Sequence, residues 1–145
     1  MLLDVVDEPT TVTQTLPLAE LWRFLPIGYL FTIAIETPIL ILGLPTKITI
    51  RQRASLGVWL TACTYPVVIL VLPALLFGKS RVGYLFVAET FAPVAECALF
   101  WLAYRTEKEL TTADWLRSMI VILIANLASF GAGEVLNAYS WFGLF

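Results

Sequence analysis

Histidine is absent from this chain of 145 residues. Its absence removes the side chain that most often binds zinc or haem iron and that most often acts as a general base near neutral pH. Cysteine is scarce as well. Cys63 and Cys97 both lie in apolar stretches, and no C-x-x-C pair exists for thiol redox chemistry. The chain also lacks the H-E-x-x-H, G-x-S-x-G, Walker and dinucleotide-binding motifs, so we expect that it is not an enzyme.

Charge is the second scarcity. Charged residues make up 14% of the chain and hydrophobic residues 59%, with a mean hydropathy of +0.85. The formal net charge of −2 and the lack of a long Lys/Arg block disfavour nucleic acid as a partner. Such a composition is typical of an integral membrane protein, whose first partner is the lipid bilayer.

The apolar residues gather into four stretches, each long enough to cross a hydrocarbon core of about 30 Å. The predicted spans are residues 25–44, 55–77, 82–104 and 115–136. Residues 1–22 are polar to mixed and are predicted to form an extramembrane arm, followed by a single four-span domain over residues 23–145. Early acidic residues replace the positive region of a cleavable signal, so the first span is expected to be retained. The predicted fold class is an all-α membrane protein with four transmembrane helices.

A short repeat suggests internal symmetry. The tetrapeptide Gly-Tyr-Leu-Phe opens the first span at Gly28 and the third at Gly83, and a Glu and then a Pro follow each copy. Two pseudo-symmetric helical hairpins of the same orientation would explain this pattern.

The basic residues predict an orientation. Six lie in or beside the two loops that follow the first and third spans: Lys47, Arg51, Arg53, Arg105, Lys108 and Arg117. The opposite side holds Arg23, Lys79 and Arg81. Because cytoplasmic loops carry an excess of Lys and Arg, both termini are predicted to lie outside the cytoplasm.

Carboxylates inside the spans are the main functional signal. Glu89 and Glu96 are seven residues apart and share one helical face, while Pro93 between them frees the backbone carbonyl of Glu89. Glu36 lies in the first span, and Glu134 lies near the end of the fourth. A carboxylate at mid-bilayer costs roughly 2.5 to 3.5 kcal/mol, so such residues usually face a bundle interior or a wet cavity.

Two interpretations of these acids stay open. Together with Thr64 and the carbonyls near the prolines, Glu36, Glu89 and Glu96 could bind a hard cation or relay protons, because all of these groups offer oxygen ligands. Alternatively, each acid is protonated and hydrogen-bonded to a neighbouring helix, where it serves packing alone. The residues identify no particular metal and no cofactor.

The fourth span carries a small-residue seam. Ala125, Ser129 and Gly133 recur at a spacing of four, which allows close helix packing. The seam predicts association into a homo-oligomer or with other membrane subunits. It supports an alternative function, that of a non-catalytic subunit or assembly factor of a larger membrane complex.

Four short motifs together suggest a resemblance. They are Glu36-Thr37-Pro38, Thr64-Tyr65-Pro66, the E-x-x-x-P-x-x-E pattern from Glu89 to Glu96, and N-L-A-S-F-x-x-G from Asn126 to Gly133. This set resembles small uncharacterised bacterial four-helix integral membrane proteins. The resemblance implies a multi-pass location in the bacterial inner membrane or an equivalent membrane, and it implies no activity.

Overall fold

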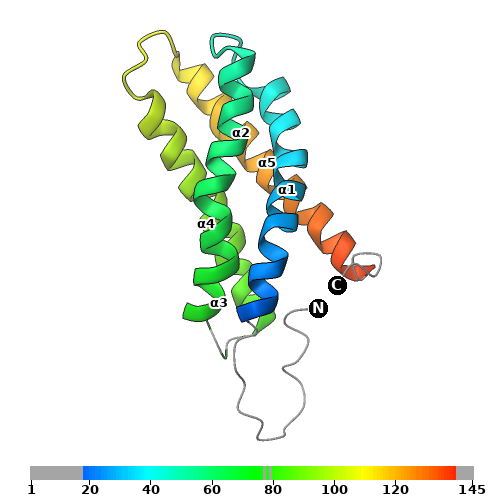
Figure 1. Ribbon diagram of the computed structural model, residues 1–145. Coiled ribbons are helices and arrows are strands. Elements are labelled where there is room, and N and C mark those ends of the chain that lie inside the picture. Colours follow the sequence, from blue (N-terminus) through cyan, green and yellow to red (C-terminus); the bar gives the residue numbers. More distant parts are fainter. Residues whose placement is uncertain (1–17, 77, 79, 140–145) are drawn as a thin grey trace, which may run out of the picture.

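The computed structural model describes residues 18–76, 78 and 80–139 (Figure 1). Four helical rods fill this part of the chain. They are α1 (Leu18–Gly43), a composite rod of α2 (Ile50–Pro66), η2 (Val67–Val71) and α3 (Leu72–Leu75), then α4 (Arg81–Tyr104) and α5 (Thr112–Ala138). Each rod is long and apolar enough to cross a membrane. The predicted class, an all-α protein with four membrane-spanning helices, is confirmed.

The rods form an up-and-down bundle. α1 packs against α2 and α5, and α4 packs against the same two rods. Because successive rods are antiparallel, residues 44–49 and 105–111 connect them at one end of the bundle, which we call the loop end. α1 begins and α5 ends at the opposite end, which we call the terminal end (Figure 1).

Helix starts differ from the sequence prediction because two capping boxes begin helices early. Thr49 and Gln52 cap α2, and Thr111 and Asp114 cap α5. Two of the predicted loop arginines, Arg51 and Arg53, therefore lie in α2. Similarly, α1 already begins at Leu18 and includes the last residues assigned to the arm, whereas residues 1–17 lie outside the described residues.

A π-helical turn interrupts the second rod at Val67–Val71. Pro73 has no N–H to continue an α-helical ladder, and the Leu72 N–H bonds instead to the Val67 carbonyl, five residues back. The carbonyl of Val68 thereby loses its usual partner and accepts a hydrogen bond from the Tyr84 hydroxyl at 2.9 Å. A side chain of α4 thus stabilises the irregular turn.

The bundle has an apolar exterior. In the apolar 18-residue segment of each rod, only 17% to 22% of the residues are buried inside the protein. Large side chains such as Leu42 (80% exposed) and Phe86 (73% exposed) face outward. Several polar side chains are buried instead: Glu36, Arg53, Thr61, Thr64, Glu96, Ser118 and Asn126. This inverted polarity fits a protein whose surroundings are lipid, where buried polar groups connect helices.

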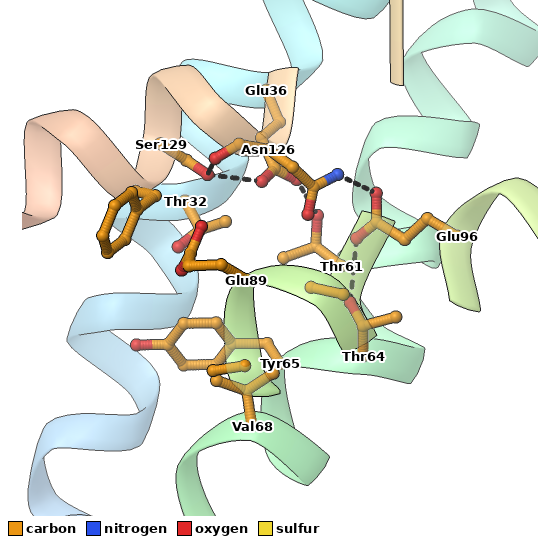
Figure 2. Close-up of a pocket in the computed structure, with 13 residues that line it drawn as sticks. Thr32, Glu36, Thr61, Thr64, Tyr65, Val68, Glu89, Glu96, Asn126 and Ser129 are labelled. Atoms are coloured by element: carbon orange, nitrogen blue, oxygen red, sulfur yellow. Dashed lines mark hydrogen bonds between the residues drawn. The ribbon is translucent and has the colours of Figure 1, made fainter. Parts of the chain in front are cut away.

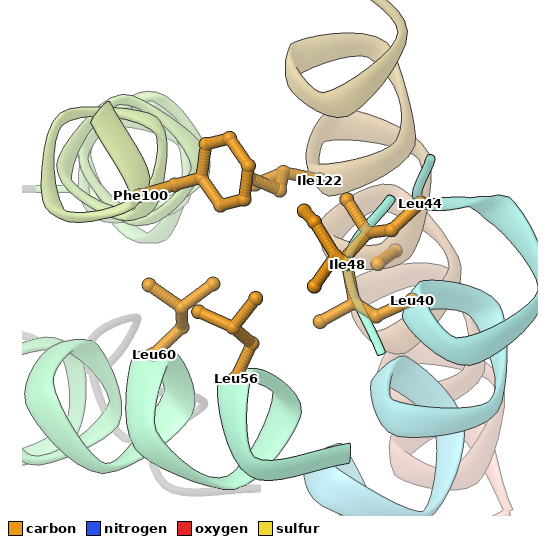
Figure 3. Packing of buried hydrophobic residues seen from close by; sticks show 8 residues of the cluster. Leu40, Leu44, Ile48, Leu56, Leu60, Phe100 and Ile122 are labelled. Atoms are coloured by element: carbon orange, nitrogen blue, oxygen red, sulfur yellow. The ribbon is translucent and has the colours of Figure 1, made fainter. Parts of the chain in front are cut away.

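Apolar packing is concentrated toward the loop end. Its buried cluster contains Leu40, Leu44, Ile48, Leu56, Leu60, Phe100, Ile122 and Ala125. Figure 3 shows side chains from all four rods pointing toward one another in this layer. Phe100 is fully buried and packs edge-on against Trp115, with ring centroids 5.5 Å apart.

Basic side chains fix the loop end. The Arg53 guanidinium is buried and donates to the carbonyls of Ile41, Pro45 and Ile48 at 2.7–2.9 Å. Arg117 donates to the Gly43 carbonyl at 2.6 Å. These bonds satisfy carbonyls at and beyond the C-terminal end of α1, where cations also complement the helix dipole.

The repeated tetrapeptide lies at two different heights. Gly28 is nearly three turns into α1, whereas Gly83 lies in the first turn of α4. Gly28 also has a local role, since a Cβ there would overlap the Tyr65 hydroxyl. α1 and α4 run in the same direction, but the two tetrapeptides do not occupy equivalent positions.

Candidate functional site

A polar cavity of about 110 Å³ lies between the four rods, next to the apolar cluster. Its lining consists of Thr32, Glu36, Thr61, Thr64, Tyr65, Val68, Ala88, Glu89, Ala92, Glu96, Asn126, Ser129 and Phe130. Figure 2 shows the polar side chains converging from different helices. The volume and polarity allow several water molecules.

Glu36 enters this site from α1 and is 2% exposed. Its Oε2 accepts a hydrogen bond from the Thr61 hydroxyl of α2 at 2.9 Å, and its Oε1 accepts one from the Ser129 hydroxyl of α5 at 2.6 Å. Each carboxyl oxygen of Glu36 therefore accepts a hydrogen bond from a different neighbouring helix.

Glu96 enters from α4 and is held in a parallel way. Its Oε1 accepts from the Thr64 hydroxyl of α2 and its Oε2 from the Asn126 amide of α5, each at 2.8 Å. Each of the two buried acids thus receives one donor from α2 and one from α5. The donors on each helix are three residues apart, about one turn, so one polar layer connects all four rods.

The hydroxyl hydrogens in this layer are outnumbered by their acceptors. Thr61 Oγ1 lies 2.7 Å from the Gly57 carbonyl as well as near Glu36, and Thr64 Oγ1 lies 3.1 Å from the Leu60 carbonyl as well as near Glu96. A hydroxyl carries one hydrogen. When that hydrogen points to the helix carbonyl, a protonated carboxyl can supply the hydrogen of the other bond. The layer can therefore accommodate added protons without moving a helix.

Glu89 differs from the other two acids. It is half-buried, and no described residue donates a hydrogen bond to it. Figure 2 shows its carboxyl group between Thr32 and Tyr65. It lies within electrostatic range of Glu36 and of Glu134, which pairs with Arg81 at 2.7 Å nearer the terminal end. The acids therefore form a series from the terminal end into the bundle.

None of the described residues that line the cavity is Lys or Arg. Three carboxyl groups share this space, and an uncompensated buried charge is strongly unfavourable. The described residues also contain no group of three or more acidic or cysteine side chains placed to hold a metal ion.

The structure brings most of the residues singled out in the sequence to this site. Glu36, Glu89, Glu96 and Thr64 line one cavity, and Ser129, expected to pack helices, donates to Glu36. Ala125 is buried in the neighbouring apolar cluster. Gly133 stands apart, and a Cβ built on it meets no described atom within 4 Å.

Sequence reasoning missed two members of the network. Neither Thr61 nor Asn126 was among the candidate site residues, yet they donate to Glu36 and Glu96 respectively. A signal was available, since Thr61 precedes Thr64 by three residues and Asn126 precedes Ser129 by three. Two polar residues one turn apart indicate a shared buried face.

The fold and the site together define a small polytopic membrane protein with a carboxylate-lined interior. Comparisons with protein-family models, curated proteins and solved structures gave no match to this chain.

Proposed function

We propose that this protein binds protons at the carboxyl groups of the buried Glu36 and Glu96 and the half-buried Glu89, in a non-catalytic role. The observation that supports the proposal is their gathering in one cavity where no Lys or Arg stands among the lining residues that the structure describes. Acids in such surroundings need a counter-charge or a proton.

A proton suits the geometry better than a metal cation does. All four carboxyl oxygens of Glu36 and Glu96 already face hydrogen-bond donors. Each of these oxygens already uses one of its two lone pairs on a donor, so fewer lone pairs remain for the six or more oxygen ligands that a cation such as Ca²⁺ takes. A proton needs only a shift of hydroxyl hydrogens. Glu89 accepts no hydrogen bond from a described residue, so it is the acid best placed to exchange protons with water in the cavity.

Labelling with dicyclohexylcarbodiimide tests the proposal, because this apolar reagent couples to protonated carboxyl groups. The protein in lipid vesicles would be labelled over a range of pH and the modified peptides identified by mass spectrometry. We expect labelling at the cavity acids, with a pH dependence that differs from that of Glu107, an exposed loop carboxylate.

The matched variants are Glu89→Gln and Glu96→Gln, each of which removes one reactive carboxyl while keeping its size. Labelling that is confined to exposed acids at every pH would contradict the proposal. Suppression by Na⁺ or Ca²⁺ at constant pH would instead identify the ligand as a cation.

A second candidate function is that of a subunit in a larger membrane complex. The observation that favours it is open space beside α5, since Cβ atoms built on Gly131 and Gly133 meet nothing within 4 Å. On this hypothesis Gly133→Leu would abolish co-purification with membrane partners, whereas Gly57→Leu would damage the bundle itself. Recovery of the wild type as a single monodisperse species would contradict this candidate.

A further inference from the structure

We propose that water and protons reach the carboxylate cavity from the terminal end of the bundle alone, and that the loop end is sealed. This inference rests on the proposed function for its meaning, although the access route can be tested by itself. In the described conformation, protons would then reach the site from one end of the bundle only.

The cavity extends in one direction from the acids. In α1 the lining residue beyond Glu36 is Thr32, toward the terminal end, and in α4 the lining continues from Glu96 to Ala92 and Glu89 in the same direction. The lining extends the same way in the other two rods. Val68 lies on the terminal side of Thr64, and Phe130 lies on the terminal side of Asn126. In none of the four rods does the lining extend from the polar layer toward the loop end.

An apolar layer follows the polar layer immediately on the loop side. Every rod contributes to it one helical turn from a network residue: Leu40 follows Glu36, Phe100 follows Glu96, Leu60 precedes Thr64 and Ile122 precedes Asn126. All four apolar side chains are at most 1% exposed. Close-packed side chains at these positions leave no polar path for water.

The loop end beyond this layer is held by polar contacts as well as by packing. The buried Arg53 bonds to three carbonyls around the first connection. Lys47 joins the two connections, since it donates to Asp114 at 2.6 Å and to the Glu109 carbonyl at 2.8 Å. Opening this end would require these bonds to break together.

The terminal end offers a polar route instead. Glu134 and Arg81 pair there, each with more than a third of its side chain exposed, and Glu89 lies between this pair and Glu36 in electrostatic range. In the orientation that the basic residues predict, this end faces away from the cytoplasm. The site would then report on protons outside the cytoplasm.

Cysteine accessibility in sealed, oriented vesicles tests the route. In a Cys63→Ala, Cys97→Ala background, single cysteines replace Ala92 in the cavity and the fully buried Ser118 on the loop side. Ala138→Cys and Lys108→Cys, at exposed positions, mark the terminal and loop ends. A charged, membrane-impermeant methanethiosulfonate reagent is added to each side in turn, and retained folding is checked by circular dichroism.

We expect the reagent to modify Ala92→Cys from the same side as Ala138→Cys. Reaction from the side that modifies Lys108→Cys should be at least about tenfold slower, because transfer of a charged reagent into a dry apolar layer is unfavourable. Ser118→Cys should react from neither side. Reaction of Ala92→Cys from the Lys108 side, or from neither side, would overturn the inference. One-sided reaction in a protein whose acids never take up protons would contradict the proposed function and leave the route standing.

Discussion

The two halves of the bundle use the same four rods for opposite purposes. One turn along each helix separates a polar residue from an apolar one, as with Glu36 and Leu40 or Glu96 and Phe100. On the loop side the rods meet through close apolar packing, and on the terminal side they meet through hydrogen bonds around a cavity. In lipid, where burial of apolar surface gives little driving force between helices, both shape matching and polar contacts hold a bundle together. The difference teaches that one half of the bundle is held by apolar packing and the other by hydrogen bonds around a cavity.

The largest effect is expected from disturbing the apolar half. Phe100→Ala should lower the free energy of unfolding by about 3 kcal/mol, because it leaves a void where a large side chain is fully enclosed. Phe86→Ala, on the same helix but 73% exposed, should change it little. Unfolding in mixed micelles measures both. Equal losses would mean that the two halves pack alike.

Close approach of α1 and α2 is the next most sensitive feature. A Cβ on Gly57 would lie 2.9 Å from the Thr37 Cα, so Gly57→Ala should cost about 1 to 3 kcal/mol through overpacking. Gly131→Ala, where a Cβ meets nothing within 4 Å, is the control. Unchanged thermal stability of Gly57→Ala would show that the helices separate without cost.

In the polar half, the stability of a variant should depend on the hydrogen-bonding groups of the new side chain rather than on its size. Glu96→Gln should fold with nearly unchanged stability, since its amide can donate to Thr64 while its carbonyl accepts from Asn126. Glu96→Leu should cost about 1 to 3 kcal/mol, because it removes the acceptor for both donors. The same unfolding assay compares the two variants. A stable leucine variant would indicate that the network contributes nothing to the fold.

The smallest effect belongs to the loop-end ion pair. Lys47→Ala should cost less than about 1 kcal/mol, because Lys47 is 40% exposed and solvent screens its bond to Asp114. Added salt should reduce this cost further. Thermal unfolding at low and high ionic strength would reveal it, and a large, salt-independent loss would show that this end relies on the pair.

The sequence predicted the coarse picture well. Four long apolar stretches predict four spans, and the acids Glu89 and Glu96 on one helical face indicate a bundle interior. Helix starts were predicted less well, because the capping box at Thr49 extends α2 back through Arg51 and Arg53. The partners of the acids were not predictable in full, since a donor such as Asn126 acts on Glu96 only after the rods assemble in a particular order.

Infrared difference spectroscopy of the protein in lipid, recorded across pH for the wild type and Glu96→Gln, tests the central claim most directly. The account predicts a carboxylic acid band that titrates in the wild type, is lost or shifted in the variant and does not depend on Na⁺ or Ca²⁺. A band that never titrates, or that changes with a cation at constant pH, would contradict proton binding at these buried carboxyl groups.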